Sequence, residues 1–360
     1  MNANDILIIG IGQAGNNLAE EVCKKNKRIT GICFNSSSDD MAGLTATKTF
    51  ALAGTGGAGR NREQAKIFLK DQAPLIVDTM KDYHMKKHVF IAFSMGGGTG
   101  SGMTPILLNL LYKMQPDKQY NIIPILPFEK ESKGMQENTI ECWKELTQLF
   151  DKNIGAIYLL DNNKRKTKQA VNREFADLFN IYLNSTNAHI DGVIDRRELE
   201  ILGTTKGLTA IYDIKRYVDE PEKIITDVMN DSIFVLKSDI IENVGLSVPQ
   251  DFNTEFIIDY FKPYGENFEG FTDNNPMLML SGVKATNKAV EHAYDTYTYK
   301  KLQLEENRKR IEEREAESDL ELDLETTKKP LIKTTTSTEQ TTIDDILNCG
   351  DSFWDDIMNM

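Results

Sequence analysis

Apolar runs of strand length alternate with longer amphipathic stretches through the first half of the chain. The runs are typical of buried strands and cover residues 5–9, 29–34, 48–52, 88–93, 120–126 and 155–160. Apolar residues at helical spacing predict helices over residues 18–25, 63–83, 103–113 and 135–150. We expect Pro74 to kink or split the second of these helices. The alternation predicts an α/β fold with a doubly wound parallel sheet.

The second half of the chain has a different pattern. Apolar side chains recur at helical spacing over residues 169–183, which predicts a long central helix buried along one face. We interpret its aromatic residues as core rather than as ligand contacts. Strand-like runs at 208–214, 233–237 and 277–283, with a helix around 221–229, predict a smaller α+β domain.

Charged residues dominate the end of the chain. From residue 287 to about 318 they predict one long helix, solvated or in contact with a partner, in which Glu305–Lys309 and Glu306–Arg310 are favourable i,i+4 pairs. The Thr- and Lys-rich sequence after residue 319 predicts a disordered linker. Residues 343–360 mix apolar and acidic side chains, which fits a docking peptide for a basic partner or a purely disordered tail. We favour docking because of Phe353 and Trp354.

A glycine-rich loop, Gly96–Gly102, stands between the run at 88–93 and the helix predicted to follow it. Glycines let backbone amides approach a bound group, and the N-terminus of the following helix favours anions. Thr99 and Ser101 add hydroxyl groups. Because no lysine follows the glycines, the loop is not a Walker A motif. We interpret it as a phosphate cradle rather than a flexible linker.

Two further glycine loops follow strand-like runs. Gly10, Gly12 and Gly15 fit the dinucleotide pattern G-x-G-x-x-G, but Asn35 stands where a dehydrogenase would carry a ribose-binding acid. The other loop covers residues 54–59. Loops after parallel strands share one edge of the sheet, so the three predict a nucleotide whose phosphates are wrapped by backbone.

Composition restricts the functional classes. A formal net charge of −13 argues against direct nucleic-acid binding by the body of the protein. The four cysteines are scattered, which fits a reducing cytosol. His84 and His88 lack a third ligand nearby, so we assign no residue to a metal. No signal peptide or membrane span is predicted, and we expect a cytoplasmic protein without membrane contact.

The glycine-rich loops of the sequence resemble those of the tubulin/FtsZ superfamily of GTPases. The sequence GGGTGSG at 96–102 is similar to the signature loop of that family, and the resemblance spans about residues 5–290. It implies that three loops bind the nucleotide. The first loop comprises Gly12, Gln13, Ala14, Gly15 and Asn16, the second Gly56, Gly57, Ala58 and Gly59, and the third Gly96, Gly97, Gly98, Thr99, Gly100 and Ser101.

The resemblance also implies the remaining parts of a GTP site. Glu131 falls in the loop on the ribose side, Asn172 falls where tubulins place a guanine-reading Asn, and Asn162 or Asn163 supplies another base contact. The implied ligands are GTP or GDP, with Mg²⁺ held by phosphates and water. Since residues 35–40 depart from the bacterial division pattern, we assign no metal role to Asp39 or Asp40.

Asp195 and Glu198 have two possible roles. Their spacing alone favours the N-cap of a short helix. The resemblance instead places them in the synergy loop, whose acidic residues enter the site of the next subunit and orient the water that attacks the γ-phosphate.

The resemblance implies an organisation and a cellular role. A GTP-binding domain covers residues 1–168, a core helix 169–190, an activation domain 191–286, a charged helix 287–318 and a tail 319–360. The long charged helix makes the chain most similar to the TubZ group of plasmid or phage tubulins. We therefore expect homopolymer filaments that move or position DNA through a DNA-binding adaptor held by the C-terminal region. The alternatives are a phage spindle tubulin, an FtsZ-like division filament and, more distantly, an NAD-dependent oxidoreductase.

Overall fold

Two parallel strands, β1 (Ile6–Ile11) and β4 (His88–Ser94), form the centre of the fold, where Leu7 pairs with Val89 and Gly10 with Ala92. The computed structural model describes residues 1–52, 56–150, 152, 154–185, 192–272 and 274–321. Every residue of β1 is buried, as expected for a parallel strand covered on both faces.

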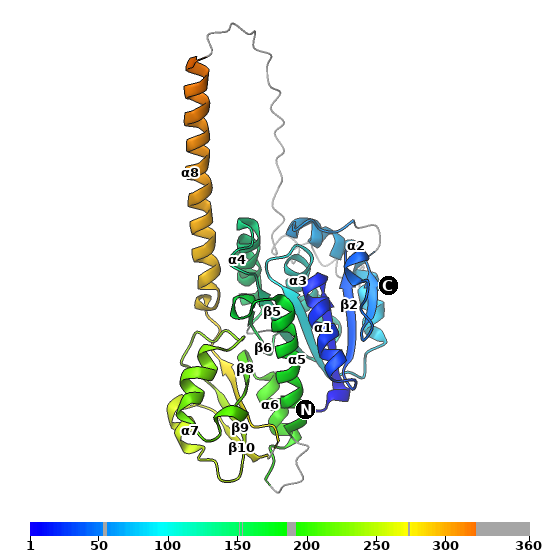
Figure 1. Cartoon of the computed structure of the whole chain (residues 1–360). Coiled ribbons are helices and arrows are strands. Elements are labelled where there is room, and N and C mark those ends of the chain that lie inside the picture. Colours follow the sequence, from blue (N-terminus) through cyan, green and yellow to red (C-terminus); the bar gives the residue numbers. More distant parts are fainter. Residues whose placement is uncertain (53–55, 151, 153, 186–191, 273, 322–360) are drawn as a thin grey trace.

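One sheet runs through the described chain in the order β10-β9-β11-β8-β6-β5-β4-β1-β2-β3, and β7 also pairs with β5 (Figure 1). The pairings from β3 to β8 are parallel, whereas β11 is antiparallel to both β8 and β9. The other strands are β2 (Thr30–Asn35), β3 (Lys48–Ala51), β5 (Gln119–Leu126), β6 (Ala156–Ile157), β7 (Leu160–Asp161), β8 (Gly207–Asp213), β9 (Asn243–Val248), β10 (Asn267–Phe271) and β11 (Met277–Val283). The predicted α/β fold class is confirmed.

The helices pack in two groups. Helix α1 packs mainly against α5, and α3 packs mainly against α2 and also contacts α4; α1 and α3 make fewer contacts with each other. The connection β1–α1–β2 runs in one direction along the sheet and β4–α3–β5 in the other, so right-handed connections place α1 and α3 on opposite faces. The helices are α1 (Gly12–Lys25), α2 (Arg62–Lys81), α3 (Thr99–Met114), α4 (Lys133–Thr147), α5 (Lys168–Asn184), α6 (Arg196–Thr204), α7 (Glu255–Phe261) and α8 (Glu291–Glu321).

This change of direction creates a crevice at the carboxyl ends of β1 and β4. In open α/β sheets ligands bind at such a switch point. The first and third glycine loops of the sequence follow these two strands directly, so the topology brings them to one edge.

Some local predictions were wrong. Helix α2 is not split at Pro74, because it continues through this residue as one helix; its face that includes Ala73, Ile76 and Val77 is buried. Residues 233–237 form no strand: Phe234 makes an isolated bridge with Leu160. The strands β9 and β10 and helix α7 were not predicted.

The charged C-terminal helix is confirmed as α8, which extends from the body of the molecule (Figure 1). Its first turns pack against α4. The predicted linker and docking peptide lie mainly at residues 322–360, outside the described part of the chain.

Three cysteines of the described residues, Cys23, Cys33 and Cys142, are buried and free. Burial raises the pKa of the Cys23 and Cys142 thiols to about 12, which keeps them protonated and unreactive. Cys349 lies outside the described residues. No helix of the described ranges combines the length and the apolar character that crossing a bilayer requires.

Candidate functional site

A cavity of about 270 Å³ lies at the switch point between β1 and β4. All three glycine loops reach it. Its lining includes eleven of the sequence-predicted site residues: Gly12, Gln13, Ala14, Gly57, Ala58, Gly59, Gly97, Gly98, Thr99, Gly100 and Glu131. It also includes Ile11, Asn35, Ser36, Ser37, Asp40, Arg60, Ser94, Met135 and Lys168, which were not predicted as site residues.

The residues of the loop after β1 have two different roles. Gly12 has φ +70° and opens α1 beside the cavity. Gly15 and Asn16 do not line the cavity. A Cβ at Gly15 would lie 2.0 Å from the carbonyl oxygen of Ala92, and Asn16 is fully buried, with its amide group 2.8 Å from the carbonyl of Gly10. Both residues fix α1 closely against the sheet.

The loop after β4 ends at the N-terminus of α3, whose first N–H groups have no partner within the helix. Thr99 lines the cavity, and its hydroxyl lies 2.8 Å from that of Ser36. Ser101 instead points into the loop and donates to the carbonyl of Gly97. Gly96 also lies outside the lining. The helix N-terminus and the loop amides suit an anion.

The loop before α2 adopts left-handed backbone conformations. Gly57, Gly59 and Arg60 have φ of 95°, 55° and 66°. A Cβ at Gly56, Gly57 or Gly59 would meet nothing within 4 Å, so space is left next to this loop. Gly56 does not line the cavity, and residue 54 lies outside the described part.

Two charged residues face each other at the far side of the cavity. Glu131 accepts a hydrogen bond from the backbone N–H of Phe128 at 2.9 Å, and Lys168 donates to its other oxygen at 2.6 Å. Lys168 is the first residue of α5. Sequence reasoning missed it because its proximity to Glu131 arises only when α5 packs beside the loop after β5.

Asp40 is a second residue that the sequence analysis did not place in the site. It accepts hydrogen bonds from Gln13 at 3.0 Å and from Asn35 at 3.3 Å. These bonds join the loop after β2 to the start of α1. Within the described ranges, no group of three or more His, Cys, Asp or Glu side chains is arranged to hold a metal ion.

The three predicted base-contacting asparagines lie outside the cavity lining and differ from one another. Asn163 is fully used: it donates to Asp161 at 2.8 Å and to the carbonyl of Pro127 at 3.2 Å, and accepts from the N–H of Glu129 at 2.9 Å. Asn162 and Asn172 are buried. The side-chain oxygen of Asn162 has no hydrogen-bond partner among the described residues, and such an orphaned acceptor is costly unless a ligand pairs with it.

Asp195 and Glu198 are not at the cavity. Asp195 caps α6 by accepting from the N–H of Glu198 at 2.8 Å, and Glu198 accepts from the N–H of Asp195 at 2.7 Å. This is a capping box. Helix α6 lies beside the C-terminal part of α5, where Tyr182 donates to the carbonyl of Leu199, whereas Lys168 at the other end of α5 lines the cavity (Figure 1). A helix of 17 residues spans about 25 Å. Within one chain the pair cannot reach the cavity.

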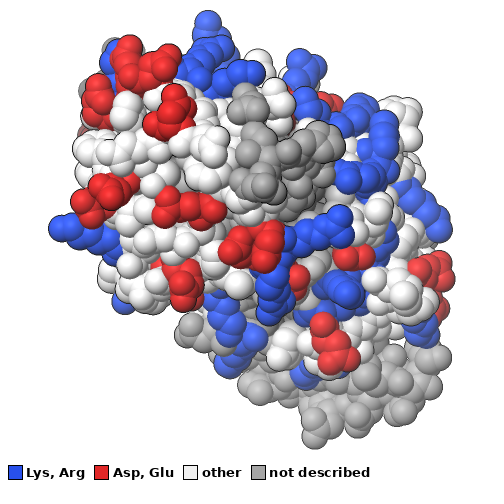
Figure 2. Space-filling view, turned by 90° about the horizontal axis from the view of Figure 1, so that it is seen from below, with Lys and Arg blue, Asp and Glu red and all other residues white. Residues whose placement is uncertain are grey.

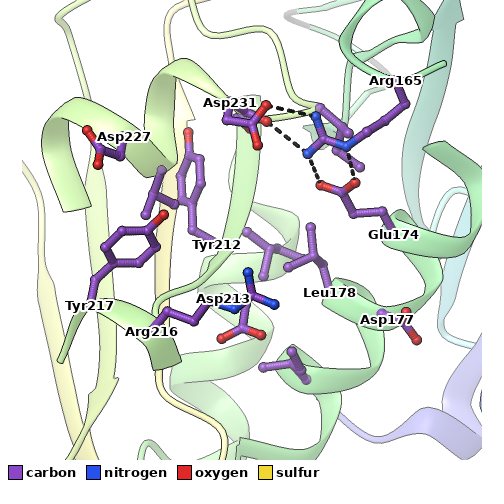
Figure 3. Close-up of a pocket in the computed structure, with 15 residues that line it drawn as sticks. Arg165, Glu174, Asp177, Leu178, Tyr212, Asp213, Arg216, Tyr217, Asp227 and Asp231 are labelled. Atoms are coloured by element: carbon purple, nitrogen blue, oxygen red, sulfur yellow. Dashed lines mark hydrogen bonds and ion pairs between the residues drawn. The ribbon is translucent and has the colours of Figure 1, made fainter. Parts of the chain in front are cut away.

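A second cavity, of about 420 Å³, opens between α5, β8 and the segment that follows β8 (Figure 3). Figure 3 shows the guanidinium of Arg165 between Glu174 and Asp231, to which it donates at 2.5 and 2.6 Å and at 3.1 Å. The rest of its charged lining is Asp177, Asp213, Arg216 and Asp227. Carboxylates outnumber cations in it, so this cavity does not suit a polyphosphate.

Comparisons with known proteins agree with the geometry of the first cavity. Residues 5–166 match the family model "Tubulin/FtsZ family, GTPase domain". The tubulin-like protein TubZ of Clostridium botulinum C phage is 28% identical over 295 residues, which are 80% of this chain and 81% of that protein.

Solved structures show the same fold. The crystal structure of Clostridium botulinum phage c-st TubZ has a TM-score of 0.77 at 26% identity and covers 84% of this chain and 99% of that one. A GTPγS-form protofilament of TubZ from Bacillus thuringiensis serovar israelensis has a TM-score of 0.71 at 17% identity, with 85% and 94% covered.

Proposed function

We propose that this chain, whose residues 5–166 match the Tubulin/FtsZ GTPase domain, is a GTPase that polymerises head to tail and hydrolyses GTP where subunits meet. The observation that carries the proposal is the convergence of three glycine loops on one cavity at the switch point of the sheet. Backbone amides and a helix N-terminus bind phosphates without a lysine.

Different residues at the cavity would bind different parts of GTP. We infer that the amides of the loops at 12–14, 57–59 and 97–100 hold the phosphates, and that Glu131 binds on the ribose side. The base would satisfy the buried oxygen of Asn162 and contact Asn172. Mg²⁺, when bound by the phosphates and water, would neutralise phosphate charge.

Hydrolysis requires that a water molecule be oriented for attack on the γ-phosphate. We propose that Asp195 and Glu198 of a second copy orient this water, because the two carboxylates lie at the start of α6. Helix α6 contacts the C-terminal part of α5, whereas α5 begins at the cavity. A head-to-tail contact brings the α6 end of one copy to the nucleotide edge of the next. The protofilament formed by the TubZ from Bacillus thuringiensis is consistent with this arrangement.

For the cellular role, we propose that the filaments move or position plasmid or phage DNA through a DNA-binding adaptor that the C-terminal region holds. The similarity to a phage TubZ extends over 80% of this chain, beyond the GTPase domain. The net charge of −13 for the whole chain argues against direct nucleic-acid binding, and the face in Figure 2 carries Asp and Glu as well as Lys and Arg.

Phosphate release at increasing protein concentration tests the core of this proposal, with electron microscopy of the same samples. We expect turnover of GTP, not ATP, to rise more steeply than protein concentration and to begin where filaments appear. Turnover that is strictly proportional to protein concentration, or an absence of filaments with GTP, GDP and GTPγS, would contradict it. A pulldown with residues 343–360 tests the adaptor: a DNA-binding protein supports it, and a membrane anchor supports a division role.

A further inference from the structure

A single side chain on α4 contacts two of the glycine loops. The amide nitrogen of Asn138 lies 3.0 Å from the carbonyl oxygen of Arg60 and 3.2 Å from those of Gly96 and Gly97. Asn138 belongs to neither loop and does not line the cavity. It therefore links the loop before α2 to the loop after β4 from behind.

The geometry of the peptide bond gives these contacts a consequence for the cavity. In a trans peptide, the carbonyl of one residue and the N–H of the next point in opposite directions. When Asn138 holds the carbonyls of Gly96 and Gly97, the N–H groups of Gly97 and Gly98 point away from α4. Both glycines line the cavity, and none of the described residues accepts a hydrogen bond from either N–H.

The same face of α4 makes a second connection two turns later. Glu145 pairs with Arg62 and, at 3.0 Å, with Lys66 on α2. Arg62 in turn donates to the carbonyl of Ser101 at 3.1 Å. Helix α4 thus supports the ends of both loops through Glu145, while Asn138 contacts both loops directly.

We propose that Asn138 is a positioning residue of the GTP site, which orients the amides of Gly97 and Gly98 toward the phosphates and fixes the distance between the two loops. This inference rests on the proposed function and names a residue that acts through the loop backbone. The loops already touch closely, since a Cβ at Gly98 would lie 2.9 Å from Arg60. A small rotation of either loop would therefore displace the other.

The plain alternative is that Asn138 only anchors α4. That helix is held by a buried face that includes Trp143 and Leu146, whereas Asn138 is partly exposed. If Asn138 only anchors α4, its replacement should lower the affinity for every nucleotide equally. If Asn138 positions the loop amides, the loss of affinity should grow with the number of phosphates in the nucleotide.

The test compares Asn138→Ala, Asn138→Ser and a control, Glu141→Ala, in the full chain. Glu141 is exposed on the same helix and pairs only with exposed Lys144 among the described residues, at 2.7 Å. Affinities for GDP and GTPγS are measured below the concentration at which filaments form, with GTP turnover above it and thermal unfolding without nucleotide.

For Asn138→Ala we expect affinity for GTPγS to fall about tenfold, affinity for GDP to fall less, and turnover at saturating GTP to fall about tenfold to a hundredfold. Asn138→Ser keeps one hydrogen-bond donor, so its affinities and turnover should lie between those of the alanine variant and the original chain. The serine variant keeps the test valid if the alanine variant does not fold. Equal losses for both nucleotides with a lower melting temperature, or no loss, would overturn the inference. Failure of the unmodified protein to bind either nucleotide would instead overturn the proposed function.

Discussion

Gly15 shows that a motif residue can serve the site without touching its ligand. The sequence pattern G-x-G-x-x-G predicts a nucleotide loop, but it does not separate the glycines that face a phosphate from those that pack a helix. In the structure, Gly12 lines the cavity and Gly15 faces the carbonyl of Ala92. Which glycine faces the ligand and which packs the helix depends on how closely α1 approaches β4, and a local sequence pattern does not encode this tertiary distance.

Replacing Gly15 with Ala should therefore destabilise the protein. The added Cβ would lie 2.0 Å from the oxygen of Ala92, and overpacking of this kind costs about 1–3 kcal/mol. Gly134 is the matched control, because it is also helical and has nothing within 4 Å of its Cβ position. Urea unfolding should show a lower free energy of unfolding for Gly15→Ala, and an unchanged or slightly higher one for Gly134→Ala. Equal stabilities of the two variants would contradict this account.

His88 predicts how stability depends on pH. The ring is buried at the start of β4, its Nδ1 has no partner among the described residues, and burial lowers its pKa below the ordinary value of 6.5, an effect that nearby Glu200 partly opposes. As the pH falls through 6.5, the unfolded chain takes up a proton that the folded chain does not. Stability is therefore lost toward acid, by at most about 1.4 kcal/mol per pH unit for this group.

The measurement is urea unfolding between pH 7.5 and 5.5 for the original chain and for His88→Gln. We expect the variant to lose stability less steeply over this range, whatever its stability at pH 7.5. Parallel curves for the two proteins would show that other groups cause the pH dependence.

At the scale of elements, the strands with continuous apolar runs were predicted, whereas some short elements of the second half were missed. The buried strands β1, β4 and β5 contain continuous apolar runs, which sequence alone identifies. By contrast, β10 reads Asn-Phe-Glu-Gly-Phe and lies at the edge of the sheet. It pairs only because β9 supplies a partner, so local sequence could not reveal it.

Helix α8 was predicted from its charge pairs, but its contact with the nucleotide edge was not. Lys300 donates to the carbonyl of Glu131, and Tyr297 lies 3.4 Å from Glu137 on α4. Lys133 also lies over the ring of Tyr297, 5.2 Å from its centre. The start of α8 thus contacts the loop that carries a cavity-lining carboxylate.

Loss of this contact should weaken nucleotide binding. For Lys300→Ala we expect affinity for GDP and GTPγS to fall about two- to tenfold, the value of one hydrogen bond of about 0.5–1.5 kcal/mol. Lys301 is exposed on the same helix, so Lys301→Ala is the control for lost charge. Equal affinities of the two variants, measured by titration calorimetry, would show that α8 does not support the loop.

At the scale of the molecule, the proposed site draws on residues of two copies of the chain. Spacing predicted that Asp195 and Glu198 cap a helix, and the structure shows that they do. The catalytic role that the resemblance implies stays a prediction, because it depends on how two copies of the chain contact each other, which the sequence alone does not reveal. The two roles are compatible, since a carboxylate at an exposed helix start remains accessible to a second copy.

Glu198→Gln separates the two roles. A glutamine can still accept from the N–H of Asp195 and keep the capping box, while the negative charge is lost. We expect Glu198→Gln to keep its stability, nucleotide affinity and filaments but to lose at least about tenfold in GTP turnover. Glu198→Ala should lose the same turnover and, in addition, about 1 kcal/mol of stability. If Glu198→Gln hydrolyses GTP at the original rate, Glu198 is only a cap.

Mixing two impaired variants tests whether the carboxylate acts between copies. Thr99→Ala alters the phosphate loop of its own subunit but leaves its Asp195 and Glu198 intact, whereas Glu198→Gln has the reverse defect. In a random equimolar copolymer, about a quarter of head-to-tail contacts join an intact loop to intact carboxylates. The mixture should therefore hydrolyse GTP faster than the average of the two separate variants. Turnover equal to that average would show that Glu198 does not complete the site of a neighbouring copy, and would overturn the head-to-tail mechanism.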